Sequence, residues 1–211
     1  MITVRHSIET VFFIGITMAV MLFVMVQRNN SKNQSVFSAA LPVVITPMPT
    51  PTPKGPQISI MDSPEGSKTL TLEMQQDKDI TTYTLSASSK SDNEKKQLFK
   101  KVEPNSQILS IPFNTWSTDN VYVFLKEKTP SMDNYLVFQS SGNVFPDEAA
   151  FVSIQELFSK KVPGYVIEDV TGWAGPTSLI VNTKALGDSR KVSFWFEVPS
   201  QSFIQLSTYF N

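Results

Sequence analysis

The stretch Ile111-Pro-Phe-Asn-Thr-Trp-Ser-Thr-Asp-Asn-Val-Tyr-Val-Phe-Leu-Lys126 decides the fold of this chain. It predicts a strand that ends at Trp116, a tight turn over Ser117–Asn120, and a second strand. Asp and Asn favour such a turn because they hydrogen-bond their own backbone and tolerate the left-handed region. The run Val121–Leu125 is apolar without a break, whereas a strand with one wet face should alternate. We therefore expect a sheet that other sheets cover on both faces.

The same pattern recurs in three units from Ile58 onward, each about 55 residues long. A repeat of short strands with a turn after the first is typical of a propeller blade. We also expect one short inserted helix over Asp147–Lys161, which replaces or covers the fourth strand of the second unit. The first unit opens with Ile58–Lys68 and continues with Thr69–Met74, Ile80–Ala87 and Gln97–Lys101. The second unit has Leu109–Trp116, Val121–Lys126 and Asn134–Gln139, and the third has Tyr165–Trp173, Ser178–Asn182, Val192–Val198 and Ser202–Ser207.

The turns carry a resemblance to a known family. Trp116-Ser-Thr-Asp-Asn and Asp62-Ser-Pro-Glu-Gly-Ser-Lys resemble the Trp-Ser-Pro-Asp-Gly-Lys signature of TolB-type β-propeller repeats. The segments Phe194–Pro199 and Phe203–Ser207 resemble the third and fourth strands of that repeat. The resemblance implies protein-binding or scaffolding roles in the cell envelope and supplies no catalytic residue. The residues that carry the signature, and that we expect to be structural, are Pro64, Gly66, Trp116, Asp119, Trp173 and Trp195.

The number of units conflicts with a closed ring. Propellers close with typically 4–8 blades, and only three units fit between Ile58 and Asn211. Either the sheets stack openly, or another chain completes the stack, or the fold is a three-sheet variant. Open ends would leave faces exposed for interaction. The expected fold class is all-β, with propeller-like stacked antiparallel sheets in about three four-stranded units.

The amino-terminal residues 1–28 predict one transmembrane helix. Thr10–Val26 is uncharged and almost wholly apolar. As a helix these residues would rise about 25 Å, close to the roughly 30 Å hydrocarbon layer once their neighbours are added. A cleaved signal peptide is the main alternative, but the apolar run is longer than usual and the small residues Ser38–Ala40 lie far beyond it. We favour an uncleaved, single-pass anchor that inserts in the lipid bilayer.

Residues 29–57 form a linker rich in proline and threonine. Thr46–Pro53 alternates proline with other residues, which predicts an extended polyproline II rod of roughly 25 Å. Such a spacer would hold the domain of residues 58–211 away from the membrane. We place that domain on the extracytoplasmic side of the cell membrane.

Composition excludes several function classes. From Ile58 onward there are 14 Lys and Arg against 18 Asp and Glu, a net charge of −4 that argues against nucleic acid. The chain has no Cys, and its one His is His6 beside the membrane segment. The domain therefore lacks the groups for thiol or Ser-His-Asp catalysis and for His or Cys metal sites. We expect no catalytic residue, no cofactor and no metal.

Carboxylates and aromatic rings are the groups that remain. Acid–base or calcium chemistry could use Asp77 with Asp79, Asp119 with Asn120, or Glu168 with Asp169, although acidic residues are ordinary at such turns and strand ends. Aromatic residues could form a sugar-binding platform, or they could fill the core. Successive rings in Phe194–Phe196 point to opposite faces of one strand, which favours a sheet packed on both sides. The platform candidates are Trp116, Tyr122, Trp173, Trp195 and Tyr209.

These observations favour a non-enzymatic protein-binding or scaffolding module of the cell envelope, with an envelope protein or a second copy as its partner. A carboxylate-dependent glycan-binding or glycan-active protein is the alternative. A structural remnant without a ligand is a third reading.

Overall fold

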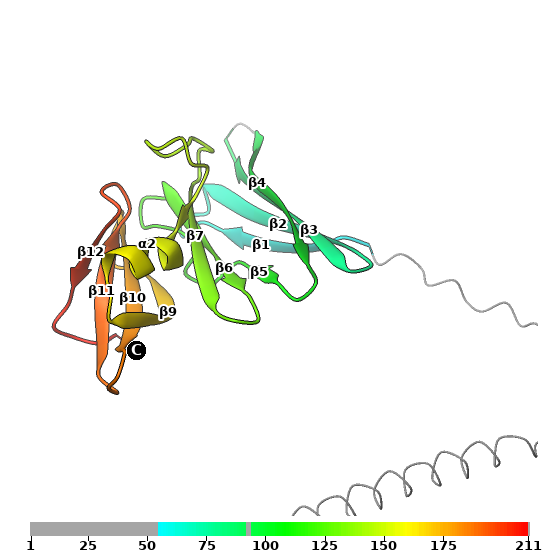
Figure 1. Ribbon diagram of the computed structural model, residues 1–211. Coiled ribbons are helices and arrows are strands. Elements are labelled where there is room, and N and C mark those ends of the chain that lie inside the picture. Colours follow the sequence, from blue (N-terminus) through cyan, green and yellow to red (C-terminus); the bar gives the residue numbers. More distant parts are fainter. Residues whose placement is uncertain (1–54, 92–93, 211) are drawn as a thin grey trace, which may run out of the picture. The chain divides into compact units, whose positions relative to one another are not determined.

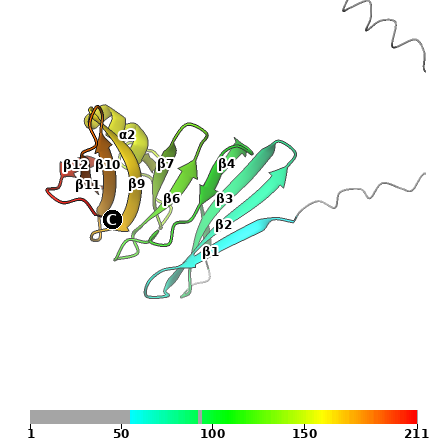
Figure 2. The ribbon, with the colours of Figure 1, turned by 90° about the horizontal axis from the view of Figure 1, so that it is seen from below.

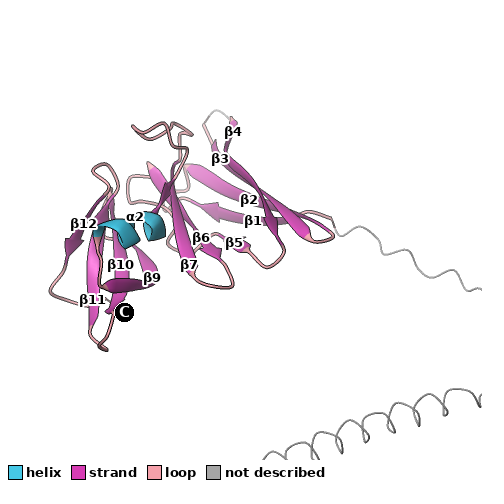
Figure 3. Ribbon diagram, in the orientation of Figure 1, coloured by secondary structure: helices cyan, strands magenta, loops and turns pink. Residues whose placement is uncertain are grey.

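The computed structural model describes residues 55–91 and 94–210. They form three antiparallel four-stranded sheets and one short helix (Figures 1 and 3). In each sheet the strands follow their order in the sequence, so consecutive strands pair as hairpins. The expected series of three four-stranded antiparallel units is confirmed.

The strand bounds are as follows. The first sheet contains β1 (Gln57–Asp62), β2 (Lys68–Asp77), β3 (Ile80–Ser89) and β4 (Lys95–Pro104). The second sheet contains β5 (Ile108–Ser110), β6 (Tyr122–Lys128), β7 (Asp133–Gln139) and β8 (Val152–Ser153). The third sheet contains β9 (Tyr165–Trp173), β10 (Ser178–Ala185), β11 (Lys191–Glu197) and β12 (Ser202–Gln205).

The second sheet is covered on both faces, as the unbroken apolar run predicts. Val123, Phe124 and Leu125 on β6 are all fully buried. Val123 and Leu125 belong to a core cluster shared with the first sheet, whereas Phe124 belongs to a cluster shared with the third sheet. Side chains alternate along a strand, so β6 supplies both clusters in turn. Each such burial stabilises the fold by about 1.5–3 kcal/mol.

The neighbouring strand β7 repeats this arrangement. Leu136 and Phe138 lie in the cluster with the first sheet, and Tyr135 and Val137 lie in the cluster with the third. Figure 2 shows the second sheet between the other two. Among the described residues, no core cluster joins the first sheet directly to the third, so each outer sheet keeps one face that no other sheet covers.

The inserted helix is shorter than expected. Helix α2 covers Ile154–Lys161, and its N-cap Ser153 accepts a hydrogen bond from the Glu156 N–H. The expectation of a helix from Asp147 is therefore wrong at its start, because the preceding residues Val152–Ser153 pair with β7 as a two-residue fourth strand. Ile154 and Phe158 anchor the helix in the cluster between the second and third sheets.

The first strand of the second sheet also differs from the expectation. The segment Leu109–Trp116 is not one strand, since β5 ends at Ser110 and Trp116 makes only an isolated bridge with Val123. Pro112 explains the break, because proline has no N–H for a sheet ladder. The residues from Ile111 to Thr115 instead form an irregular connection.

The third sheet has one face without a second sheet. Phe194 and Phe196 are buried, but Trp195 between them is 37% exposed, so the expectation that both faces of this strand are packed is wrong. The C-terminal segment Leu206–Phe210 turns back along this sheet. Its Leu206 N–H donates to Ser193 O over 2.8 Å, and its Phe210 carbonyl accepts from the Asn182 amide.

Two expectations for the amino-terminal part lie outside the described residues: the anchor Thr10–Val26 and the proline-rich rod Thr46–Pro53. Within residues 55–91 and 94–210, no helix has the length and hydrophobicity that a membrane crossing requires.

Candidate functional site

A groove of about 680 Å³ lies where the first strands of the three sheets end. One of its side chains, Phe113, is 87% accessible to solvent. Ligand sites in proteins are typically concave and mostly apolar, with a few polar groups that fix orientation. The residues that line the groove are Met61, Asp62, Pro64, Phe113, Asn114, Trp116, Thr118, Thr171, Gly172, Trp173, Ile180 and Phe210.

Two tryptophans form the floor of this groove and join neighbouring sheets. The Trp116 indole N–H donates to Met61 O of the first sheet over 3.2 Å. The Trp173 indole N–H donates to Thr115 O of the second unit over 3.0 Å. Met61 and Thr115 stand at equivalent places, one residue before Asp62 and Trp116. Each tryptophan therefore makes the same bond to the preceding sheet.

The turns after these positions are alike in the first two sheets. Gly66 N–H donates to Ser63 O over 2.7 Å, and Asn120 N–H donates to Ser117 O over 2.9 Å. Both Gly66 and Asn120 have positive φ, at 68° and 59°. Asp119 holds the second turn by accepting from the Ser117 hydroxyl at 2.7 Å. Gly66 and Asp119 thus lie in the turns, and Pro64 at the groove wall.

A close approach of backbone brings the second and third sheets together at the groove. The Asn114 amide donates to Thr171 O over 3.1 Å. A Cβ added to Gly172, whose φ is +138°, would lie 2.8 Å from the Asn114 Cβ. A larger residue at position 172 would therefore be strained and would displace the Asn114 side chain. The sequence pattern did not indicate Phe113 or Asn114, although a phenylalanine after Pro112 in an interrupted strand is a signal for an exposed ring.

The groove carries one carboxylate. Asp62 accepts a hydrogen bond from the Thr69 hydroxyl at 2.6 Å and pairs with Lys90 at 3.5 Å. The hydrogen bond from Thr69 and the charge of Lys90 outweigh partial desolvation and hold the pKa of Asp62 below its ordinary value. The groove therefore presents a negative charge at neutral pH beside its aromatic wall.

No protein-family model matches this chain, and no curated protein or solved structure matches it. The resemblance to TolB-type repeats therefore stays a prediction, and function is inferred from the geometry of the groove.

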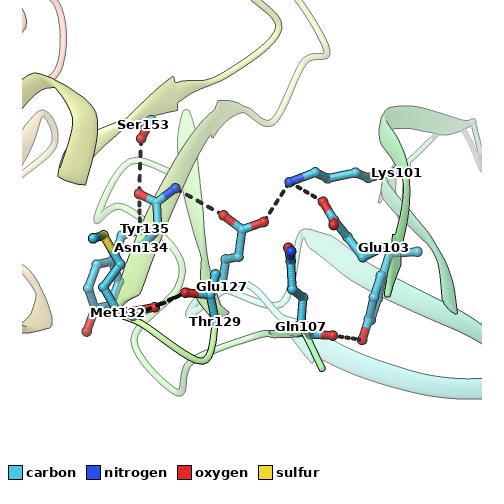
Figure 4. Close-up of polar contacts among 10 residues, drawn as sticks. Lys101, Glu103, Gln107, Glu127, Thr129, Met132, Asn134, Tyr135 and Ser153 are labelled. Atoms are coloured by element: carbon cyan, nitrogen blue, oxygen red, sulfur yellow. Dashed lines mark hydrogen bonds and ion pairs between the residues drawn. The ribbon is translucent and has the colours of Figure 1, made fainter. Parts of the chain in front are cut away.

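A polar network also joins the first sheet to the second (Figure 4). The Lys101 ammonium lies between the carboxylates of Glu103 and Glu127, and it contacts Glu127 Oε1 at 2.7 Å. Both carboxylates are more than nine-tenths buried. Burial alone would lower the pKa of Lys101, but the hydrogen bonds from its ammonium to Glu103 and Glu127 raise it overall.

The far side of Glu127 continues the network into the second sheet and helix α2. The Asn134 amide donates to Glu127 Oε2 over 3.1 Å, and Asn134 Oδ1 accepts from the Ser153 hydroxyl over 3.0 Å (Figure 4). Both carboxylate oxygens of Glu127 thus accept hydrogen bonds from this chain, one from Lys101 and one from Asn134. These buried carboxylates are structural, and no sequence pattern pointed to them because the two lie on different sheets.

A matching network joins the second sheet to the third. The buried Tyr135 hydroxyl donates to Asp169 Oδ1 over 2.7 Å, and Lys126 pairs with Asp133 at 2.9 Å and with Asp169 at 3.6 Å. Burial, followed by the hydrogen bond to Asp169, raises the pKa of Tyr135 to about 12. The pKa of Lys126 is also raised, because its hydrogen bonds to Asp133 and Tyr135 outweigh burial.

The carboxylates that the sequence singled out are not brought together. Asp169 serves the network just described, while Glu168 pairs with Lys191 at 2.9 Å and accepts from Tyr209 at 3.1 Å. Asp77 and Asp79 lie at the β2–β3 hairpin. Among the described residues, no three His, Cys, Asp or Glu side chains gather where they could hold a metal ion.

The aromatic candidates are divided in a similar way. Trp116 and Trp173 line the groove, and Tyr122 stacks on Trp173 with ring centroids 6.1 Å apart. Trp195 lies on the uncovered face of the third sheet, and Tyr209 lies in the C-terminal segment under the Lys191 ammonium. They do not form one platform.

Proposed function

We propose that this chain is a membrane-anchored, extracytoplasmic binding module of the cell envelope, built of three propeller-type repeats. Thr10–Val26 would cross the bilayer once, and the linker would carry the domain outside. The groove would hold a segment of a partner protein, and no step of chemistry is required. The observation that carries this proposal is the exposure of Phe113, 87% accessible at the rim of a groove built by all three sheets.

The chemistry of the groove indicates its partner. An exposed phenylalanine beside a buried Trp116 and a half-buried Trp173 offers apolar area at low entropic cost, which is typical of the centre of a protein interface. Asp62 adds a negative charge at one wall, and Asn114 adds a polar amide. The fitting ligand is an extended apolar segment with a basic residue near one end.

Replacing Phe113 tests this function. Phe113→Ser in the full chain should lower recovery of a co-purifying envelope protein about tenfold, because an anchoring aromatic side chain at an interface contributes about 2 kcal/mol or more. The matched control is Leu186→Ser, since Leu186 is 64% exposed and lies away from the groove. Equal recovery with both variants would contradict the assignment of the groove.

A carboxylate-dependent glycan-binding or glycan-active protein remains the alternative proposal, on the strength of the aromatic content alone. Its test is binding of the full chain to a panel of cell-envelope glycans. Binding that Trp173→Ala abolishes and Phe113→Ser leaves unchanged would favour it.

A further inference from the structure

Two polar side chains of the third sheet are buried although they lie on the face that no other sheet covers. Asn182 on β10 and Ser193 on β11 are directly paired, and they are 3% and 0% exposed. Ile180 and Trp195, two residues away on the same strands, point to the same face because side chains of a strand alternate. Trp195 is well exposed there, so the cover of the polar pair is local.

The segment Leu206–Phe210 provides this cover, mainly through one residue. The Phe210 N–H donates to Ser193 Oγ over 3.0 Å, and the Phe210 carbonyl accepts from the Asn182 amide. The Ser193 hydroxyl in turn donates to Asn182 Oδ1 over 2.6 Å. Asn182 and Ser193 thus bind both backbone groups of a single residue, and we call this pair the backbone clamp.

The side chain of the clamped residue belongs to the groove. Phe210 lines the groove together with Ile180, Trp116 and Trp173. When a protein binds an extended peptide, backbone hydrogen bonds supply affinity, and pockets for side chains supply specificity. The clamp and the groove divide these tasks in the same way. The clamp accepts the backbone of any residue except proline, and the apolar groove favours an aromatic ring.

The segment that occupies the clamp is held by few other contacts. None of the residues Leu206–Phe210 belongs to either core cluster. Beyond the clamp, its hydrogen bonds among the described residues run from the Leu206 N–H to Ser193 O and from the exposed Tyr209 hydroxyl to Glu168. Segments with few buried apolar contacts open at low cost. This segment should therefore leave more easily than the strands beneath it.

An empty clamp would be unfavourable. If the segment left, the Asn182 amide and the Ser193 hydroxyl would lose their partners together, and unsatisfied polar groups on a largely apolar surface destabilise a protein. The backbone of another extended segment offers the same N–H and C=O pair and would satisfy both groups. The geometry therefore favours exchange of one segment for another over a vacant site.

We propose that Leu206–Phe210 is an internal ligand of the groove, and that an extended segment of the partner replaces it with an aromatic residue of its own in the clamp. This inference rests on the proposed function of the groove and specifies the partner further. The partner segment carries an aromatic residue at the place of Phe210 and a basic residue toward Asp62. Because the internal ligand competes at an effective concentration of about millimolar, it excludes weakly binding segments.

A labelled peptide with the sequence of residues 206–210, Leu-Ser-Thr-Tyr-Phe, tests the clamp when both of its ends are blocked. In the full chain, Phe210→Pro removes the N–H that Ser193 accepts and the ring in the groove, so it should release the internal ligand. The peptide should bind this variant at least about tenfold more tightly than wild type. Adding Ser193→Ala should cost about tenfold in affinity. Leu186→Ser, away from the groove, is the matched control and should bind as weakly as wild type.

Changes in the peptide leave the protein untouched. N-methylation of its phenylalanine deletes only the N–H and should weaken binding about tenfold, whereas alanine in place of its threonine should have no effect. Equal binding by wild type and Phe210→Pro, or full affinity of the N-methylated peptide, would overturn the proposal. A wild-type dimer that excess peptide dissociates would also overturn it, because the occupant would then be a second copy of the chain.

Recovery of the envelope partner connects the clamp to the groove. Phe210→Pro should raise this recovery severalfold, and excess peptide should lower it. If both leave the recovery unchanged while Phe113→Ser lowers it, the groove binds its partner without the clamp and this inference is wrong. If Phe113→Ser has no effect while the peptide binds as predicted, the proposed function itself is contradicted, and with it the exchange.

Discussion

At the scale of single residues, the two groove tryptophans connect one sheet to the next. Each indole donates its N–H to a backbone carbonyl of the preceding sheet, over 3.2 Å for Trp116 and 3.0 Å for Trp173. Asp62 occupies the equivalent position in the first sheet, which no other sheet precedes among the described residues. Within the described residues, this position is therefore a tryptophan in the two sheets that follow another sheet and an aspartate in the first sheet.

Replacing each tryptophan by phenylalanine removes the N–H donor and tests this role. Trp116→Phe and Trp173→Phe should each lower the free energy of unfolding by about 1–3 kcal/mol, through one lost hydrogen bond and a smaller ring. Trp195→Phe, at a site 37% exposed, should change it by less than about 0.5 kcal/mol. Denaturant unfolding checks this, and a Trp195 effect as large as the other two would contradict it.

The Lys101 network predicts a pH dependence. The pKa of Lys101 is raised above its ordinary value of 10.5. The stabilisation is therefore complete below about pH 10.5 and is lost as the pH rises through the folded-state pKa. Lys101→Met should destabilise the protein at pH 7 by about 1–3 kcal/mol, because Glu103 and Glu127 stay buried without their cation.

The difference between wild type and Lys101→Met should narrow above pH 10.5. Exposed Lys100 on the same strand provides the matched control, and Lys100→Met should follow the wild type at every pH. Unfolding by urea at a series of pH values measures the three curves. A gap that widens with rising pH would show that the sign is wrong.

At the scale of elements, the turns after β1 and before β6 share a backbone geometry but differ in the residue that takes the positive φ. Gly66 and Asn120 share a positive φ, but only Asn120 carries a side chain there, and its Oδ1 is buried without a hydrogen-bond partner among the described residues. Gly66→Ala should cost about 1–2 kcal/mol, because an L side chain is strained in this region.

Asn120→Gly should do the opposite. It relieves the left-handed strain and removes a buried acceptor, while Lys68 and Ser140 keep their bonds to the residue 120 carbonyl. We expect a change between neutral and about 1 kcal/mol stabilising. Thermal unfolding of both variants provides the measurement, and a destabilised Asn120→Gly would contradict the shared geometry.

Local signals predicted the strands well and the irregular segments poorly. The apolar run on β6 identified the covered sheet because burial on both faces removes alternation. The predicted start of the helix at Asp147 is wrong because Val152 and Ser153 pair with β7. Helical periodicity does not report such a long-range contact. Likewise, the interrupted strand after Ser110 follows from Pro112, and the close approach of Asn114 to Gly172 joins two different sheets, which no local pattern reports.

At the scale of the whole molecule, three sheets form an open stack in which only the middle one is covered on both faces. The two core clusters meet at β6 and β7, so these strands should be the last to open. The first sheet keeps an exposed edge and the third sheet is partly overlaid by Leu206–Phe210. Both ends of the stack thus differ from its middle, as expected for terminal repeats.

The most direct test of this stack is a set of nuclear Overhauser contacts from the middle sheet. Phe138 on β7 lies 5.3 Å from Phe99 of the first sheet between ring centroids, and Phe124 on β6 lies 6.3 Å from Trp173 of the third. We predict cross-peaks for both pairs in the same sample, with none from Phe124 to Phe99. Cross-peaks from both Phe124 and Phe138 to one outer sheet only would contradict a middle sheet covered on both faces.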